Sequence, residues 1–245
     1  MKRMRLGINI DHVATVRNAR GGNHPDPLNI AIIAEECKVD NITAHLREDR
    51  RHVNENDIKN LLGKLKIPLN FEMAATSEMV DFAIENLPFA CCIVPEKRQE
   101  ITTEGGLNLK SSFEISEKIL KLKDAGIFCS LFLDPDIEQI NLAYEMGADA
   151  VEIHTGKYCD SKDKKLMNKE LDQIKKSAFF AQSKGLDVHA GHGLNFDNIS
   201  EIAKIEEITE VNIGHFLIGE AINIGIKEAI LKMRSIIDNS RSVNV

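Results

Sequence analysis

The side chains of this 245-residue chain that can transfer protons gather in a few short polar segments. Imidazoles occur at His45, in Gly191-His192-Gly193 and in Gly214-His215, and carboxylates stand within otherwise apolar stretches at Glu72 and Glu152. Histidine titrates near neutral pH, and a carboxylate enclosed by apolar neighbours has a raised pKa, so both kinds of group can accept and return protons. Enclosing so many ionisable groups without a purpose would cost several kcal/mol. The pattern therefore predicts a site for general acid–base catalysis.

Two glycine-containing turns and a set of basic side chains indicate a phosphorylated ligand. Glycines in Gly191-His192-Gly193 and Gly214-His215 allow backbone N–H groups to approach an anion, although each glycine could also serve only to form a turn. Arg50 and Arg51 stand beside Glu48 and Asp49 and could instead form an ion-paired surface. The full set of candidate anion donors is Arg17, Arg20, Arg47, Arg50, Arg51 and His52.

The polar segments end short β-rich runs that alternate with amphipathic helical patterns along the chain. Eight such βα units in about 250 residues are typical of a closed parallel barrel, so the predicted fold class is α/β, a single (β/α)8 TIM barrel with eight parallel strands. A doubly wound sheet is the alternative, but it favours a G-x-G-x-x-G turn where this chain has Asn9-Ile10-Asp11-His12. The predicted strands are Leu6–Ile10, Asn41–Leu46, Pro68–Met73, Cys91–Val94, Ile127–Leu133, Ala150–His154, Asp187–Ala190 and Glu210–Ile213.

Barrel geometry would bring the polar strand ends together, because the carboxyl ends of all eight strands face one mouth. Polar residues also recur at every second position, as in Asn70 and Glu72 or Glu152 and His154, so we expect a polar face that looks inward. The residues expected at the mouth are Asn9, Asp11, His12, His45, Arg47, Glu72, Glu96, Asp134, Glu152, His154, His189, His192 and His215.

Composition and charge exclude several other classes of protein. With 43% hydrophobic and 28% charged residues the chain can bury a large core, and we expect one domain over residues 1–245. A net charge of −7 argues against nucleic acid and anionic membranes as partners. No apolar run reaches the roughly 18 residues of a membrane span and no signal region is recognisable, so we expect a cytoplasmic protein. Five cysteines without a C-x-x-C motif do not indicate a disulfide or zinc framework.

Three further features of the chain carry expectations. Residues 14–26 and 95–108 form connections longer than a barrel requires. The second is charged and closes with Gly105-Gly106, and we expect it to act as a lid that excludes water. An apolar stripe from Ile222 to Ile237 predicts the last helix.

Six segments of the sequence resemble those of the pyridoxine 5′-phosphate synthase family. The resemblance runs from about Leu6 to about Arg234, in order and at matching intervals, and the second and third segments are highly specific. The segments are N-I-D-H-V-A-T-V-R-N-A-R-G at 9–21, H-L-R-E-D-R-R-H at 45–52, V-P-E-K-R-Q-E-I-T-T-E-G-G at 94–106, E-I-H-T-G at 152–156, A-G-H-G-L at 190–194 and N-I-G-H at 212–215.

The resemblance implies a (β/α)8 barrel with extra helices, a homo-oligomer that is typically an octamer, and no cofactor or metal. It also implies condensation of 3-amino-2-oxopropyl phosphate with 1-deoxy-D-xylulose 5-phosphate, which yields pyridoxine 5′-phosphate, phosphate and water. The imine would form between the two substrates themselves, so no lysine nucleophile is needed.

The same resemblance implies roles for individual residues. His45 and Glu72 match the family's proton acceptors, His192 its proton donor, and Glu152 its transition-state stabiliser. The residues that match ligands of the aminoketone phosphate are Asn9, Arg20, Gly193, Gly214 and His215. Those that match ligands of the deoxyxylulose phosphate are Asp11, His12, Arg47, His52 and Thr102.

Two departures from the family pattern and three other readings stay open. His189 stands where the family is expected to have Asn, and Phe216 where a smaller residue usually follows Gly-His. A class I aldolase-like barrel would use Lys157 as its nucleophile. A metal-dependent hydrolase would use His189 and His192, although the first strand lacks the H-x-H of such sites. A barrel that only binds a phosphorylated metabolite would leave Glu72 and His45 without a task.

Overall fold

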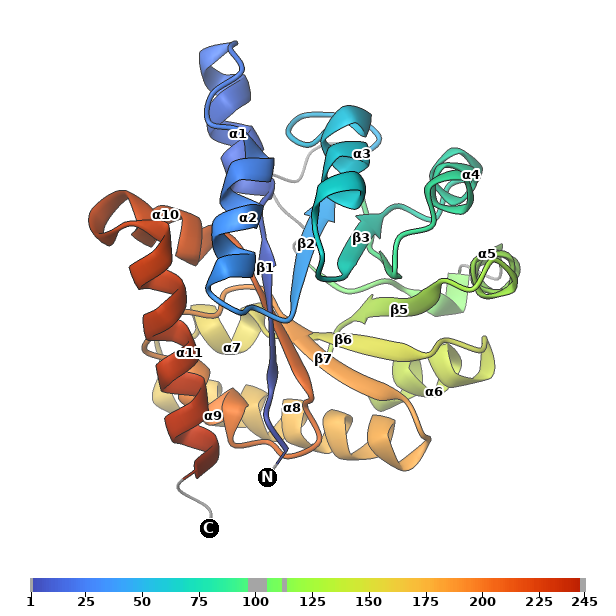
Figure 1. Ribbon diagram of the computed structural model, residues 1–245. Coiled ribbons are helices and arrows are strands. Elements are labelled where there is room, and N and C mark those ends of the chain that lie inside the picture. Colours follow the sequence, from blue (N-terminus) through green and yellow to red (C-terminus); the bar gives the residue numbers. More distant parts are fainter. Residues whose placement is uncertain (1, 97–104, 112–113, 243–245) are drawn as a thin grey trace.

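Eight parallel strands close into a barrel in a computed structural model that describes residues 2–96, 105–111 and 114–242 (Figure 1). Each strand pairs with the next in the chain, and β8 pairs with β1. The predicted closed barrel is therefore confirmed, and the alternative of an open, doubly wound sheet is wrong. The strands are β1 Arg5–Asn9, β2 Asn41–His45, β3 Leu69–Met73, β4 Ala90–Ile93, β5 Phe128–Leu133, β6 Ala150–His154, β7 Asp187–Gly191 and β8 Glu210–Ile213.

The two faces of the strands differ in polarity, as the alternation of residues predicts. Thr43 on β2 donates a hydrogen bond to Asn212 on β8 (3.2 Å), and Asn212 donates one to Glu152 on β6 (2.8 Å). These pairs join strands that are not neighbours, so their side chains lie inside the barrel. The residues that alternate with these along each strand, such as Ile42 before Thr43 and Val211 before Asn212, are fully buried on the outer face against the helices. The apolar core is thus mainly a layer between strands and helices, while the barrel interior is largely polar.

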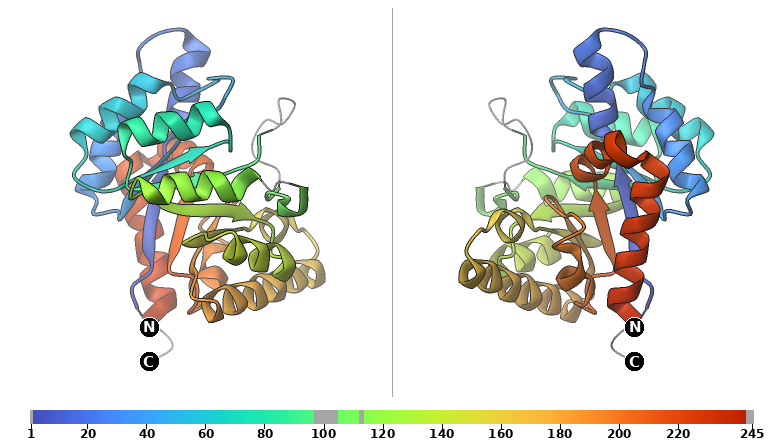
Figure 2. Two further views of the ribbon diagram at one scale, coloured as in Figure 1. Left: turned by 90° about the vertical axis from the view of Figure 1, so that its right-hand side faces the viewer. Right: turned by 90° about the vertical axis from the view of Figure 1, so that its left-hand side faces the viewer.

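The helices surround the barrel (Figures 1 and 2). Several of them begin at residues suited to that position. Asn54 forms a capping box with Asp57, and Thr76 caps the next helix. Among the described residues, none of the helices combines the length and apolarity that crossing a membrane requires. Their bounds are α1 Asp11–Arg20, α2 Pro27–Glu36, α3 Glu55–Lys64, α4 Ser77–Asn86, α5 Glu114–Asp124, α6 Ile137–Glu145, α7 Gly156–Asp160, α8 Lys164–Ser183, α9 Ile199–Ala203, α10 His215–Ile224 and α11 Ile226–Ser242, with a 3-10 turn at Leu109–Ser111.

Two sequence expectations about connections need correction. Residues 14–26, expected as a long loop, contain most of α1, because the stretch after Asp11 can form a helix that ends at Gly21 in a left-handed conformation (φ 72°). The last helix does not begin at Ile222, since Gly225 (φ 83°) separates α10 from α11. Of the expected lid over 95–108, residues 97–104 lie outside the described residues.

The two ends of the described chain meet at the amino-terminal end of the barrel. Arg234 on α11 donates a hydrogen bond to the carbonyl oxygen of Met4 (2.8 Å), and Arg241 donates one to that of Lys2 (3.4 Å). In Figure 2 the last turn of α11 lies beside the start of the described chain. The last helix therefore holds the segment before β1 by hydrogen bonds. These contacts lie at the end of the barrel opposite the predicted site.

Candidate active site

The first part of the site is a network of side chains at the ends of β1, β2 and β3. The Nδ2 of Asn9 donates to Asp11 Oδ2 (2.9 Å) and to Glu72 Oε2 (3.4 Å). Asp11 Oδ1 accepts the backbone N–H of His45 (2.8 Å), and His45 is opposite Glu72 in the strand register. Asn9 and Asp11 therefore link Glu72 to the main chain of His45, the two residues that match the family's proton acceptors, although these lie on different strands.

His45 has a partner that sequence reasoning placed at the mouth but did not pair with it. The Nε2 of His45 lies 2.7 Å from Oε1 of Glu96, which follows β4, and both side chains are about 5% exposed or less. The other oxygen of Glu96 accepts the backbone N–H of Glu48 (3.0 Å). Enclosure alone would raise the pKa of Glu96, but these contacts outweigh it and hold the pKa below its usual range.

Two other carboxyl groups of the mouth have raised pKa values. Burial, reinforced by the charges of Asp11 and Glu152, raises the pKa of Glu72 well above its usual value. Burial also raises the pKa of Glu152 to about 7, even though His189 and the amide of Asn212 favour its charged form. Glu152 can therefore exchange protons near neutral pH, and the pKa of Glu72 is raised, as expected from its sequence surroundings.

The turn after β7 holds His192 over the mouth in a conformation that is uncommon for a residue with a side chain. His192 has φ 79° and Gly193 has φ 78°, and the hydroxyl of Thr155 fixes the turn by donating to the carbonyl oxygens of Gly191 (2.8 Å) and His192 (2.5 Å). Such backbone strain concentrates at functional sites. Burial, and then the neighbouring His154, lower the pKa of His192 to about 4.

A second imidazole supports this side of the mouth. The rings of His154 and His192 meet edge to face at 4.9 Å, and Nδ1 of His154 lies 3.0 Å from Oδ1 of Asp134. Asp134, whose pKa this contact helps lower to about 2, also accepts the backbone N–H of Gly106 (3.3 Å). The carboxylate thus orients His154 and fastens the end of the β4–β5 connection.

The segments that follow the first and last strands contribute another pair of imidazoles and a helix terminus. The rings of His12 and His215 meet edge to face at 4.7 Å, and burial followed by the charge of His215 lowers the pKa of His12. A side chain at Gly214 would collide with Asn9, with its Cβ only 2.9 Å from the nearest atoms. The first turn of α10 has no side-chain cap, so its N–H groups can bind an anion beside Asn9.

The arginines divide into groups with different surroundings. Arg47 is buried at the mouth and reaches Asp49 (3.3 Å), and His52 lies close by, with its ring 5.9 Å from that of His45. Arg17 is instead part of a buried ion pair with Asp57 (2.6 Å), so its expected role as an anion donor is not supported. Arg50 and Arg51 pair with carboxylates, as the alternative reading of these residues predicted.

Not every candidate residue joins the cluster. Arg20 is the exposed last residue of α1, which projects from the barrel (Figure 1). Thr102 lies outside the described residues. Lys157 is exposed and lies 3.4 Å from Asp134, which is not the apolar surrounding that activates a Schiff-base lysine.

A group of potential metal ligands also occurs at the mouth. Asp11, His45 and His52 each offer an atom within 4.8 Å of the others. Several of their donor atoms already have partners, since Asp11 accepts two hydrogen bonds and Nδ1 of His52 accepts the N–H of Val53 (2.9 Å). A metal ion would have to compete with these contacts.

His189 occupies a position that sequence reasoning did not anticipate. It is 6% exposed and lies inside the barrel between Glu152 and Glu210 in the strand register, with Nε2 3.2 Å from Asp187 and 3.1 Å from Arg5. It therefore belongs to a polar layer beneath the mouth. His192 follows only three residues later in the chain, but it stands in the turn after β7, whereas the side chain of His189 points into the barrel from within the strand.

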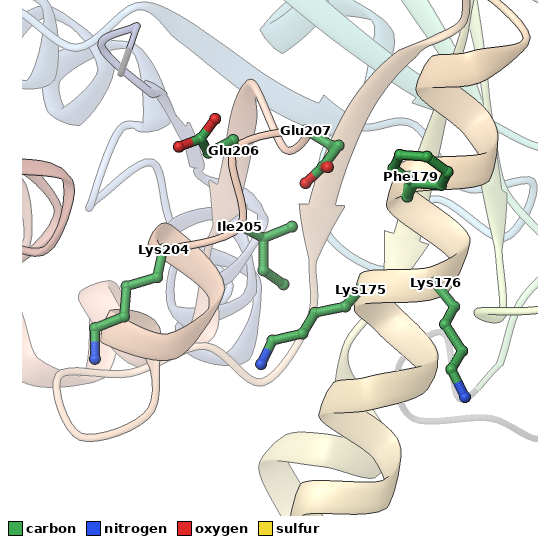
Figure 3. Close-up of a pocket in the computed structure, with 7 residues that line it drawn as sticks. All are labelled: Lys175, Lys176, Phe179, Lys204, Ile205, Glu206 and Glu207. Atoms are coloured by element: carbon green, nitrogen blue, oxygen red, sulfur yellow. The ribbon is translucent and has the colours of Figure 1, made fainter. Parts of the chain in front are cut away.

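An open groove of about 430 Å³ lies away from this cluster, between α8 and the connection from α9 to β8 (Figure 3). Its lining combines exposed lysines such as Lys175 and Lys204 with Glu206, Glu207 and the exposed ring of Phe179. None of the predicted site residues lines it.

Known proteins are similar to this chain over nearly its whole length. The family model for "Pyridoxal phosphate biosynthesis protein PdxJ" matches residues 6–239. The pyridoxine 5′-phosphate synthase of Rhodospirillum rubrum is 52% identical over 236 residues, which are 96% of this chain and 95% of that protein. The protein of the same name from a Sulfurihydrogenibium species is 54% identical over 242 residues, 97% of this chain and 99% of that protein.

Solved structures with little sequence similarity share the architecture. Thiamine phosphate pyrophosphorylase from Pyrococcus furiosus has a TM-score of 0.61 at 15% identity, covering 97% of this chain and 96% of that one. Phosphoribosyl anthranilate isomerase from Thermus thermophilus also has a TM-score of 0.61, at 12% identity, covering 96% of this chain and 99% of that one. These similarities show the fold alone.

The closed parallel barrel, with acid–base side chains gathered where its strands end, defines a (β/α)8-barrel enzyme. Both the family model and the curated relatives cover nearly all of the chain. The chain belongs to the pyridoxine 5′-phosphate synthase family.

Proposed function

We propose that this enzyme condenses 3-amino-2-oxopropyl phosphate with 1-deoxy-D-xylulose 5-phosphate and closes the pyridine ring of pyridoxine 5′-phosphate, releasing phosphate and water. Family membership supports the identity of the substrates. The observation that carries the mechanism is the convergence of Glu72, His45 and Asn9 with Glu152 within one barrel mouth. Joining an amine to a ketone and forming an aromatic ring requires repeated proton transfers, which such a cluster can perform.

In the proposed mechanism, Glu72 and His45 accept protons from the reacting substrates. A carboxyl group with a raised pKa can take a proton at neutral pH and return it in a later step. Glu152 lies close to Glu72. In its ionised form, Glu152 stabilises the positive charge that develops in the transition state. His192 donates the proton that a departing hydroxyl needs. In the absence of ligand its pKa is low, and a bound phosphate nearby would favour the charged imidazole.

Phosphate binding would orient the two reactants and supply the binding energy for their encounter. The uncapped start of α10 and the turn at Gly193 offer backbone N–H groups for the aminoketone phosphate, beside Asn9 and His215. Arg47 and His52, together with Asp11 and His12, form the adjoining side for the deoxyxylulose phosphate, since Asp11 contacts Asn9 and His12 contacts His215. The proposal assigns Thr102 to the same side from the resemblance alone.

The proposal includes a homo-oligomer, and an octamer is the state that the resemblance implies. Exposed apolar side chains support association: Val16 on α1 is 48% exposed and Ile222 on α10 is 82% exposed. They border an apolar groove of about 210 Å³ between these helices and α2. Such surface is commonly covered by a partner. The proposed location is the cytoplasm, which five free cysteines support because disulfides form in oxidising compartments.

The test is to replace Glu72 by Gln, which removes the ionisable group with little change of shape. We expect a folded protein that still binds both phosphorylated substrates but forms pyridoxine 5′-phosphate at least about 100-fold more slowly, as for loss of a general base. Product formation is followed by its absorbance. Glu78→Gln, at an exposed position on α4, serves as the matched control. An unchanged rate for Glu72→Gln would contradict the assignment.

A further inference from the structure

The contact between Glu96 and His45 has the geometry of a carboxylate that orients an imidazole. Oε1 of Glu96 lies 2.7 Å from Nε2 of His45, and its side chain is 4% exposed. Oε2 accepts the backbone N–H of Glu48 (3.0 Å). Both oxygens are therefore occupied by nitrogen partners, and charged hydrogen bonds of this length are strong when water is excluded.

This arrangement decides which nitrogen of His45 carries a proton. An ionised carboxylate can only accept hydrogen bonds, so Nε2 of His45 must be the donor. In the neutral imidazole the lone pair is then on Nδ1. A proton taken from substrate forms an Nδ1–H bond, and the imidazolium that results is stabilised by the negative charge of Glu96.

We propose that Glu96 is a positioning residue for His45, which fixes its Nε2–H tautomer and makes Nδ1 the atom that accepts the substrate proton. The inference rests on the proposed function, in which His45 is a base. In the step itself a bond from substrate to hydrogen breaks, the Nδ1–H bond forms, and the electron pair stays on the substrate. Glu96 remains ionised throughout, and Nδ1 returns the proton later.

Other charged groups face His45, but they act differently from Glu96. The carboxylate of Asp11 holds the main chain of His45 by accepting its backbone N–H. The ring of His52 lies 5.9 Å away, and its pKa is lowered mainly by burial, with a contribution from His45. Among the residues that the structure describes, the titratable and charged groups around His45 are Asp11 at the start of α1, Arg47 and His52 after β2, Glu72 on β3 and Glu96 after β4.

Replacing Glu96 by Gln tests this role sharply, because the N–H of Glu48 fixes how the new amide can lie. That N–H is a donor, so it favours the carbonyl oxygen of the amide, and the NH2 group then points at Nε2 of His45. An NH2 group needs an acceptor there, which forces the opposite tautomer, with the proton on Nδ1.

The first measurement is the ¹⁵N spectrum of histidine-labelled protein without substrate, with the His45 signals assigned through His45→Asn. We expect the Nε2–H tautomer in the native protein and the Nδ1–H tautomer in Glu96→Gln. Glu48→Gln is the matched control, since the side chain of Glu48 is exposed and only its backbone contacts Glu96. An Nδ1–H tautomer in the native protein would overturn the inference, even if the variant failed to fold.

The second measurement is the pH dependence of turnover. Glu96→Gln is expected to lower kcat at least about tenfold with little change in KM. The acidic limb of the kcat profile should move to lower pH by about one unit, because the imidazolium loses its stabilising charge. An unchanged kcat and limb would contradict the inference. If His45→Asn itself kept full activity, the catalytic assignment would fail, while the tautomer result would stand on its own.

Discussion

At the scale of single residues, the pKa values of three carboxyl groups of one mouth are shifted in different directions because their surroundings differ. Glu96 is held ionised by two nitrogen partners, whereas burial and neighbouring negative charge raise the pKa values of Glu72 and Glu152. Such separation allows one site to contain an orienting anion and groups that exchange protons. The environment, and not the residue type, assigns the task.

The raised pKa of Glu152 predicts a pH-dependent penalty on stability. Its pKa rises from 4.5 to about 7 on folding, so ionisation disfavours the folded state as pH rises through this interval. Glu152→Gln should therefore gain stability relative to the native protein between pH 5 and pH 8, on the order of 3 kcal/mol at the upper end. Urea unfolding at the two pH values measures the difference, and a gap that stays constant or narrows with pH would refute the prediction.

Individual site residues could be predicted from the sequence better than their contacts could. Glu72, His45 and Glu152 stand out because each interrupts an apolar segment. The pairing of Glu96 with His45 could not be predicted from spacing, since the two are 51 residues apart and meet only through the path of the chain after β4. His189 was placed at the mouth, whereas its register with Glu210 sets it one layer deeper.

At the scale of elements, the strands were predictable to within one residue at each end, because alternation along a half-polar strand is a direct signal. The limits of the helices were harder to predict from the sequence. The apolar stripe continues from Ile222 to Ile237, but the conformation of Gly225 breaks the helix and leaves Ile222 exposed. A glycine within an otherwise regular pattern indicates such a break only weakly.

The close approach of β7 to β6 makes Gly191 a sensitive position. A methyl group there would lie 2.2 Å from Oε1 of Glu152, so the carboxylate must move. We expect Gly191→Ala to lower kcat at least about tenfold. Gly63→Ala on α3, where a Cβ meets nothing within 4 Å, should keep full activity and gain about 0.5–1 kcal/mol of stability. Equal rates for the two variants would show that displacement of Glu152 is tolerated.

At the scale of the whole molecule, closure of the barrel gathers residues from β1 to β8, yet Arg20 stays apart. It ends the projecting helix α1, whose exposed Val16 lies beside the apolar groove. For the proposed homo-oligomer we expect Arg20 to bind substrate phosphate in the mouth of a neighbouring copy, because α1 projects away from its own barrel (Figure 1). Shared sites of this kind make activity depend on assembly.

This arrangement can be tested by co-expressing two inactive variants, Arg20→Ala and Glu72→Gln. In a mixed pair, each chain places residue 20 in the mouth of the other chain. One mouth then has both Glu72 and Arg20, and the other mouth has neither. Random pairing should then restore about a quarter of the native activity. Each variant alone provides the control. If the mixture is as inactive as its components, Arg20 does not act between chains.

The fastening of the first strand by α11 also bears on how this molecule can be handled. Lys2 and Arg241 lie together just before β1, at the end of the barrel opposite the carboxyl ends of β2 and β3, where His45 and Glu72 stand. A reporter or affinity tag joined to Lys2 or to the end of α11 would lie at the amino-terminal end of the barrel, away from the mouth. A short peptide linker could join these two positions. New chain termini could then be placed in another loop without changing the site residues.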